Sequence, residues 1–386
     1  MRQRKILFIT GSRADFYIQK PIIDAAKRSA FLSPALVVTG SHLSKKFGFT
    51  VNEILKEKYN IIGKIKNLII SDKLVSRIDG ASKQLSKLIK LVQKYKPDFM
   101  IAPFDREESI TVAITGAYMS IPVAHLGAGD RTRVNVDGII RHSVTKLSSL
   151  FFCFTKENVK RVIKLGEEKW RVFNVGHTAI ERYKNAKHLS NSYLSKYFKL
   201  NFKNEPLLIF IQHPVSNWVK KTRTHFKVSL SAIDFLNLPT IIIGSNSDPG
   251  SVIMKSEFKK YKFINKKVRY FENIPEEIFI NIIKKSSVLV GNSSMGILES
   301  PILKLPVVNI GLRQKDRQNA GNITFVKHNK SKIVKAVKKS LYNQKYLNKI
   351  KRIKNPYGKI GAPKKIIEVL SKISINNKLI SKTITY

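Results

Sequence analysis

The chain has 386 residues, of which 43% are hydrophobic, 25% charged and 9% aromatic. This composition is that of a globular protein of about two domains, and it excludes a disordered, collagen-like or coiled-coil chain. No apolar run reaches the roughly 18–20 residues that a membrane-spanning helix needs.

The formal net charge of +45 comes from 71 basic and 26 acidic residues. One interpretation is an anionic partner such as nucleic acid or a membrane surface. The other is compositional drift, since lysine, isoleucine and asparagine are abundant along the whole chain. The lysines are scattered and no nucleic-acid-reading motif accompanies them. We therefore favour drift, expect neither nucleic acid nor membrane insertion, and expect the charge to attract a small anionic substrate.

The first apolar run, 5–10, ends at once in Gly11 and a polar turn. A secretory signal would continue to a small-residue cleavage site, so we expect a first strand and a cytoplasmic protein. Cys153 is the one cysteine, which excludes an internal disulfide and a multi-cysteine zinc site. Its Phe-Phe-Cys-Phe setting predicts a buried, inert thiol.

Short apolar runs alternate with helix-length amphipathic segments such as 80–94 and 109–119. Near-continuous runs of Ile, Val, Leu and Phe are typical of strands buried on both faces of a parallel sheet. The first series of expected strands is 5–10, 35–39, 99–104, 121–126, 150–154 and 171–175. The second series is 207–212, 240–244, 268–271, 287–290 and 306–310. This pattern predicts a doubly wound α/β domain occurring twice.

The polar segment 181–205 separates the two series and is the expected connection between the domains. A helical stretch around 363–373 follows near the end of the chain. Two such domains that face each other form a cleft at the carboxyl ends of both sets of strands, and ligands bind there.

Charged residues follow the expected strands of the first series. Arg13 lies in a turn without the GxGxxG or P-loop pattern, and it either reaches an anion in the cleft or pairs with Asp15. Asp105 is either a helix N-cap or a general base. Asp137 and Arg141 are four residues apart on one helix face, which predicts a pair that is either structural or a proton acceptor.

His213 ends the strand 207–212, where it is placed to hydrogen-bond a phosphate, although a lone histidine is usually structural. Arg313 and Arg317 follow the strand 306–310 and supply cations to the same cleft. The second domain therefore has the charges that a nucleoside diphosphate requires.

The strand 287–290 ends in small polar residues, and a helix is expected to begin there. Asn292, Ser293 and Ser294 allow backbone N–H groups to approach a phosphate. Glu299, in the next turns, is placed to take both hydroxyls of a ribose. The alternative is a serine N-cap with a capping-box glutamate, which the spacing fits less well.

Between residue 6 and about residue 372 the chain carries, in order, the segments GSRADF, VVTGSHLSKKFG, FDREES, IPVAHLGAGD, DGIIRHSVTKLSSLFF, RVFNVG, QHPVS, GNSSMGILESP, PVVNIG, RQKDRQ and NPYG. With these it resembles the UDP-N-acetylglucosamine 2-epimerase family, and more closely the hydrolysing branch of sialic and legionaminic acid synthesis. The resemblance implies a glycosyltransferase-B type fold of two Rossmann-like domains facing across a cleft. Residues 1–180 would form the sugar side and 181–363 the UDP side, with the helix of 364–386 packing back on the first domain.

The resemblance also implies a mechanism without metal or cofactor. UDP leaves C1 while a base takes the C2 proton, and water then adds to the 2-acetamidoglycal to give N-acetylmannosamine or a dideoxy relative. The implied acid/base residues are Asp105 and Asp137, with Arg141 orienting Asp137. The implied nucleotide ligands are Arg13, His213, Asn292, Ser293, Ser294, Glu299, Arg313 and Arg317.

Two departures from the family's pattern lie in the sugar half. Gly127 stands where many members carry an acidic or histidine side chain, and Asp130 is our candidate for replacing that function. Phe104 stands where a small residue is expected. Because both departures lie in the sugar half, they leave the sugar's 4- and 6-substituents open and do not touch the nucleotide half. The sequence separately leaves open the choice of UDP or GDP.

The alternatives are a non-hydrolysing 2-epimerase, a glycosyltransferase of the same fold and a non-catalytic sugar-nucleotide sensor. A transferase needs an acceptor site, for which the sequence has no candidate. The expected partners are a UDP-sugar substrate and further copies of the chain in a dimer or tetramer.

Overall fold

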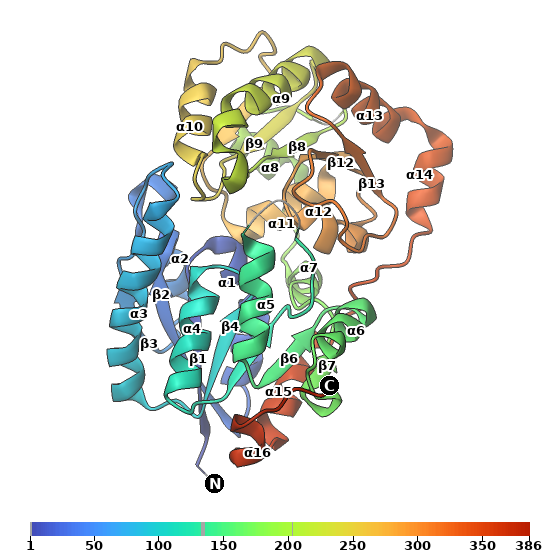
Figure 1. The fold of residues 1–386 in the computed structure, drawn as a ribbon. Helices are drawn as coiled ribbons and strands as arrows, with labels where there is room; N and C mark the ends of the chain where they lie inside the picture. The colour runs from blue at the N-terminus through green and yellow to red at the C-terminus, as the bar shows by residue number, and fades with distance from the viewer. Residues whose placement is uncertain (1, 133–135, 203) are drawn as a thin grey trace.

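The computed structural model describes residues 2–132, 136–202 and 204–386. Two parallel sheets lie one above the other, with the N-terminal half of the chain below and most of the C-terminal half above (Figure 1). The sequence predicted two doubly wound α/β domains, and the structure confirms both. Their arrangement is that of the glycosyltransferase-B fold.

The first sheet has, in the described residues, seven strands in the order β3-β2-β1-β4-β5-β6-β7. Its strands are β1 (Arg4–Thr10), β2 (Leu32–Thr39), β3 (Ile61–Ile65), β4 (Phe99–Pro103), β5 (Val123–Leu126), β6 (Leu150–Cys153) and β7 (Val172–Asn174). All of its pairs are parallel, and Ile6 of β1 lies opposite both Pro34 of β2 and Phe99 of β4. The strand order reverses between β1 and β4, and ligands bind beyond such a point.

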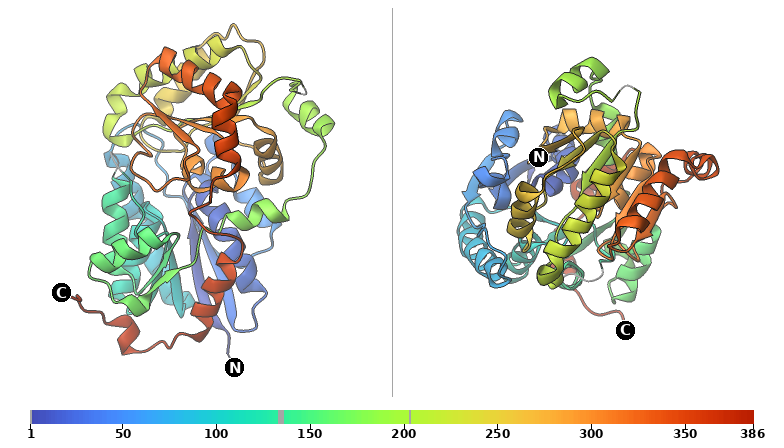
Figure 2. Two further views of the ribbon diagram at one scale, coloured as in Figure 1. Left: turned by 90° about the vertical axis from the view of Figure 1, so that its right-hand side faces the viewer. Right: turned by 90° about the horizontal axis from the view of Figure 1, so that it is seen from above.

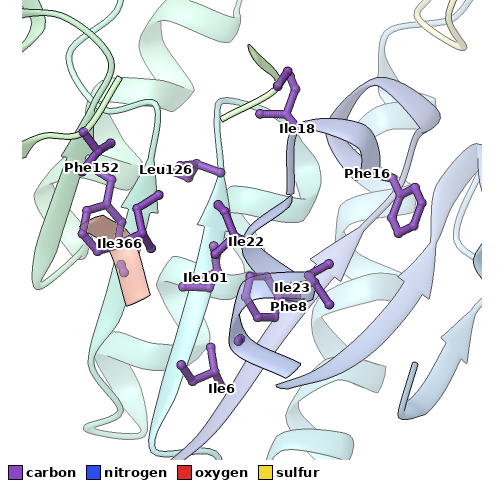
Figure 3. Close-up of a cluster of buried hydrophobic side chains, with 14 of the residues drawn as sticks. Ile6, Phe8, Phe16, Ile18, Ile22, Ile23, Ile101, Leu126, Phe152 and Ile366 are labelled. Atoms are coloured by element: carbon purple, nitrogen blue, oxygen red, sulfur yellow. The ribbon is translucent and has the colours of Figure 1, made fainter. Parts of the chain in front are cut away.

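Helices cover both faces of this sheet. They are α1 (Arg13–Lys27), α2 (Val51–Lys56), α3 (Val75–Tyr95), α4 (Glu107–Tyr118), α5 (Asp137–Leu147) and α6 (Lys156–Lys164). Side chains alternate along a strand, so Ile6 and Phe8 pack toward α1, while Leu7 and Ile9 pack in the core that includes α3 and α4. Figure 3 shows the α1 side, where Ile22 and Ile23 meet the strands.

The second sheet has, among the residues described, six parallel strands in the order β10-β9-β8-β11-β12-β13. Its strands are β8 (Leu208–Ile211), β9 (Thr240–Ile243), β10 (Val268–Phe271), β11 (Val288–Gly291), β12 (Val307–Ile310) and β13 (Ile323–Val326). Its helices are α9 (Thr222–Leu236), α10 (Ser251–Lys260), α11 (Glu276–Lys285), α12 (Met295–Leu298), α13 (Lys330–Tyr342) and α14 (Gln344–Lys351).

Short 3₁₀ turns occur in both halves of the chain, at Gly40–Leu43, Lys45–Phe47, Lys169–Arg171, Ser216–Lys221 and Ser300–Leu303.

The expected connection 181–205 holds two helices, α7 (Ile180–Asn185) and α8 (Asn191–Phe198). After α14 the chain returns to the first sheet with α15 (Ala362–Lys372) and α16 (Asn377–Ile380), as Figure 2 shows. Ile366 joins the core of the first sheet, and Arg4 donates to the carbonyls of Leu370 at 2.8 Å and Ile373 at 2.7 Å. The domain limits at 180 and 363 stay a prediction.

The expected strands all occur, but two edge strands were missed. β3 contains a glycine and a lysine and has only one buried residue, and no residue of β13 is buried. β3 lacks the apolar run that marks a central strand, whereas β13 was missed although its sequence is Ile-Thr-Phe-Val. Cys153 is buried, as expected.

Candidate active site

A cavity of about 230 Å³ lies between the two sheets, at the carboxyl ends of strands from both. Ten of the twelve residues expected in the site line it: Arg13, Asp105, Asp130, Asp137, Arg141, His213, Ser293, Ser294, Arg313 and Arg317. Asn292 and Glu299 are not among its lining residues. The expectation that Glu299 lines the same cavity is therefore wrong.

Arg141 contacts Asp105, not Asp137 as the four-residue spacing suggested. One of its terminal nitrogens pairs with Asp105 Oδ2, and the other donates to the carbonyl of Gly127 at 2.7 Å. The long side chain reaches the ends of β4 and β5 instead of folding back along its own helix. Arg141 therefore orients Asp105 at the wall of the cavity.

Asp137 is the first residue of α5, and it is buried among charged side chains. Burial raises the pKa of Asp137 to about 6, and the negative charges of Asp105 and Asp248 add to the shift. Arg313 and Arg77 oppose it, Arg77 Nη1 being 3.9 Å from Asp137 Oδ1. A carboxyl with such a pKa can exchange a proton near neutral pH, as a general acid or base must.

Asp130 forms an ion pair with Arg317 and so joins the two halves of the chain. Its other oxygen accepts the backbone N–H of Arg131 at 2.7 Å. Burial disfavours the charged form of Asp130, but the guanidiniums of Arg317 and Arg141 outweigh it and hold the pKa of Asp130 below its ordinary value. Asp130 is thus held as an anion beside the cavity, and the catalytic role suggested for it stays a prediction.

His213 presents a neutral donor to the cavity. Burial, with the nearby Arg313, lowers the pKa of His213 to about 3. Its Nδ1 accepts the backbone N–H of Asn246 at 3.0 Å, which leaves the ring proton on Nε2. Nε2–H is therefore available to an anionic oxygen.

Asn292 does not line the cavity, but its side chain holds the backbone of His213. Its side chain accepts from the backbone N–H of His213 at 2.7 Å and donates to the His213 carbonyl at 2.9 Å. Its own carbonyl accepts from Arg313 and from Gln314, both at 3.1 Å. Asn292 therefore positions the groups that line the cavity.

Ser293 and Ser294 directly precede the short helix α12. Ser294 is its N-cap residue, but the Ser294 side chain makes no capping hydrogen bond. The capping-box alternative for Glu299 is therefore excluded. Glu299 instead pairs through Oε2 with Arg182, and it accepts from the hydroxyl of Tyr183 at 2.7 Å. Its ribose-binding role stays a prediction.

Sequence reasoning missed several contacts that join the two halves. Arg106 pairs with Asp248 at 2.7 Å, and Asp72 accepts backbone N–H groups at the start of α10, including that of Gly250 at 2.6 Å. Arg13 does not pair with Asp15 and donates to the carbonyl of Ile274 at 2.5 Å. Arg106 lay within the FDREES segment, but nothing in the sequence tied it to a residue 142 positions away.

Within residues 2–132, 136–202 and 204–386, no three His, Cys, Asp or Glu side chains gather as metal ligands. Over the same residues, no helix has the length and apolar character to cross a membrane.

A sequence model of the family described as UDP-N-acetylglucosamine 2-epimerase matches residues 24–371. A GDP/UDP-N,N'-diacetylbacillosamine 2-epimerase (hydrolyzing) of Campylobacter jejuni is 34% identical over 84% of each chain. A polysialic acid biosynthesis protein P7 of Escherichia coli is 33% identical, over 93% of this chain and 91% of that one. A UDP-N,N'-diacetylbacillosamine 2-epimerase (hydrolyzing) of Legionella pneumophila is 27% identical over 99% of this chain and 100% of that one.

Solved structures show the same fold. A UDP-GlcNAc 2-epimerase from Neisseria meningitidis bound to UDP-GlcNAc has a TM-score of 0.80 at 19% identity, covering 96% of this chain and 100% of that one. The enzyme from Methanocaldococcus jannaschii in complex with UDP-GlcNAc and UDP has a TM-score of 0.72 at 22% identity, covering 95% and 99%.

Proposed function

The chain belongs to the UDP-N-acetylglucosamine 2-epimerase family, and from this premise we propose that it is a hydrolysing 2-epimerase of a nucleotide-linked 2-acetamido sugar. The observation that carries the proposal is one cavity that is lined both by carboxylates, Asp105 and Asp137, and by candidate phosphate donors, among them His213. Relatives named as hydrolysing diacetylbacillosamine 2-epimerases support this branch. The substrate is UDP-N-acetylglucosamine or its diacetylbacillosamine counterpart, carried by UDP or GDP.

In the first step the C1–O bond breaks and its electron pair leaves with the nucleoside diphosphate. A carboxylate takes the C2 proton, and the C2–H electrons form the C1=C2 bond of the 2-acetamidoglycal. Nε2–H of His213, the two serines and Arg313 offer donors to the diphosphate as its charge grows.

In the second step water adds its oxygen to C1 and gives up a proton, while C2 receives a proton on the opposite face. The sum is hydrolysis with inversion at C2. Asp137, with its pKa near 6, is the proposed base. Asp105, oriented by Arg141, is the second carboxylate at C1–C2.

An isotope experiment tests this proposal. In ¹⁸O water the free sugar should carry ¹⁸O at C1, because water supplies the new hydroxyl. In D₂O it should carry deuterium at C2, because the base exchanges its proton with solvent. Mass spectrometry of the products decides: C2 deuterium without free sugar would indicate the non-hydrolysing epimerase, and neither label would indicate a transferase or a sensor.

The pH profile gives a separate prediction. A base must be deprotonated to act, so kcat/KM should fall with a slope of one as pH falls through about 6, the pKa of Asp137, and should level off above it. The UDP-sugar is esterified at both ends of its diphosphate and titrates well below this range. An initial-rate profile that stays flat down to about pH 5 would remove Asp137 as the base.

We propose further that the enzyme works in the cytoplasm as a dimer or tetramer. Sedimentation of the purified chain at several concentrations tests the oligomeric state.

A further inference from the structure

His125 is a fully buried histidine for which the proposed mechanism has no use. It lies on β5, opposite Ala102 of β4, and none of its surface is exposed. Burial lowers the pKa of His125 to about 3, so the ring is neutral near pH 7. A neutral imidazole has one N–H and one bare nitrogen, and inside a protein each of them needs a hydrogen-bond partner.

The two ring nitrogens of His125 join α5 to the end of β4. Nε2 lies 2.7 Å from the carbonyl oxygen of Phe104, and since a carbonyl only accepts, Nε2 carries the proton. Nδ1 is then the acceptor, and the hydroxyl oxygen of Thr145 on α5 lies 3.0 Å from it. The same hydroxyl is 3.0 Å from the carbonyl of Arg141, so its one proton serves both acceptors. The ring is thus a bridge between a helix and the end of a neighbouring strand.

Phe104 is the residue whose backbone this histidine holds. Its φ angle is +65°, in the left-handed region that a phenylalanine rarely adopts. Its N–H donates to the carbonyl of Leu126 at 2.9 Å, so both polar groups of its backbone are bonded to β5. A strained backbone persists only where its surroundings hold it. Because the peptide group is planar, a fixed Phe104 carbonyl also fixes the peptide plane that leads into Asp105.

The side chain of Asp105 is held from the same helix. Asp137, Arg141 and Thr145 follow one another at intervals of four residues and are all buried, so they share one face of α5. Arg141 pairs with Asp105 Oδ2. The helix α5 therefore holds the Asp105 carboxylate through Arg141 and the backbone before it through Thr145 and His125. Since Asp137 begins the same helix, one frame carries both carboxylates of the proposed reaction.

We propose that His125 is a positioning residue, which holds the backbone at Phe104 and so sets the Asp105 carboxylate in its place relative to Asp137. The inference rests on the proposed function and adds a residue to its machinery. A displacement of about 1 Å in a reacting group can lower a rate by about 10²-fold without any loss of binding groups. Loss of the hydrogen bond to Phe104 should therefore lower kcat and leave the affinity for UDP in place.

Two amides that differ by one methylene group test this role. In His125→Gln the amide nitrogen stands as many bonds from the backbone as Nε2 does, so it can still donate to the Phe104 carbonyl. In His125→Asn the amide nitrogen reaches only the level of Nδ1, and the carbonyl loses its donor. We expect kcat of His125→Asn to fall by about 10²-fold and His125→Gln to recover at least about tenfold of this loss. UDP affinity should stay within about twofold in both variants, because the candidate phosphate donors are unchanged.

A change at Asp105 distinguishes positioning from a general loosening of the domain. Asp105→Asn removes the carboxylate that His125 is proposed to position. If His125 acts through this carboxylate, adding His125→Asn to Asp105→Asn should lower kcat by less than about twofold more. A general loosening would instead repeat the loss of about 10²-fold in this background. Initial rates of UDP release from UDP-N-acetylglucosamine or UDP-N,N'-diacetylbacillosamine, whichever the native enzyme hydrolyses, measure both losses.

Equal kcat in the native enzyme and in His125→Asn, or a full loss that persists in the Asp105→Asn background, would overturn the inference and leave the proposed function standing. If His125→Asn is misfolded and binds no UDP, Thr145→Val decides, since it removes the hydroxyl at Nδ1 and keeps the shape of the side chain. It should lower kcat by more than about threefold, and only where the Asp105 carboxylate is present. A native enzyme that releases UDP from neither substrate would overturn the proposed function, and the role of His125 with it.

Discussion

Replacing Asp137 by asparagine should lower kcat by about 10²–10⁴-fold, the usual effect of removing a positioned acid or base. The amide keeps the size of the carboxyl but accepts no proton. Since the change leaves the candidate phosphate donors His213, Ser293 and Ser294 in place, the affinity for UDP should stay within about twofold of the native value. Initial rates and UDP titration of the same preparation give both quantities.

His213→Ala is the matched control, in which we expect the affinity for UDP, and not the proton transfer, to change. It removes a neutral N–H donor from the diphosphate end, so it should weaken UDP binding. It should leave the acid limb of the pH profile in place, because that limb belongs to Asp137. Unchanged turnover in Asp137→Asn would exclude this residue from the proton transfer.

The fold was predictable because its central strands are local features of the sequence. Runs such as those of β1 and β8 are apolar on both faces, and their burial confirms what the runs predicted. The edge strand β3 has three half-buried positions, one exposed and one buried, and its glycine and lysine interrupt the apolar run, so it resembles a loop. Local pattern therefore predicts the centre of each sheet better than its edges.

The site was predictable in its members and less so in its contacts. The residues that follow strands β1, β4, β8 and β11 reach one cavity because the carboxyl ends of parallel strands meet at one edge of a sheet. Arg141 shows the limit: the spacing on one helix suggested Asp137, but Asp105, 36 residues away, is its partner. Helical spacing cannot reveal a partner on a neighbouring strand.

The charged residues that line the cavity differ in kind from those that give the chain its net charge of +45. Only 26 acidic residues occur in the chain, yet six of them line the cavity: Asp15, Asp105, Glu108, Asp130, Asp137 and Glu272. Among the residues that the structure describes, no lysine lines the cavity, and its cations are the arginines Arg13, Arg106, Arg141, Arg313 and Arg317. This distribution supports compositional drift as the source of the charge.

Asp130→Ala should be the most destabilising single change at the cleft. It would leave the buried guanidinium of Arg317 without its carboxylate, and removing one partner of a buried ion pair costs roughly 3–5 kcal/mol. The free energy of unfolding, measured with denaturant and without nucleotide, should fall accordingly. Glu368→Ala breaks the exposed pair with Lys372 and is the control expected to leave stability unchanged.

The double variant Asp130→Ala/Arg317→Ala separates a structural role from a catalytic one. It removes both charges, so it should regain part of the stability lost in Asp130→Ala, because no uncompensated charge remains buried. Asp130→Asn also removes the charge opposite Arg317 and should lose stability, but it keeps the shape of the side chain and one hydrogen-bond acceptor. If Asp130 supplies the carboxylate that Gly127 lacks, the folded Asp130→Asn variant should lose about 10²–10⁴-fold in kcat. A loss below about tenfold in Asp130→Asn would confine Asp130 to holding the two halves together and leave the proton transfers to Asp105 and Asp137.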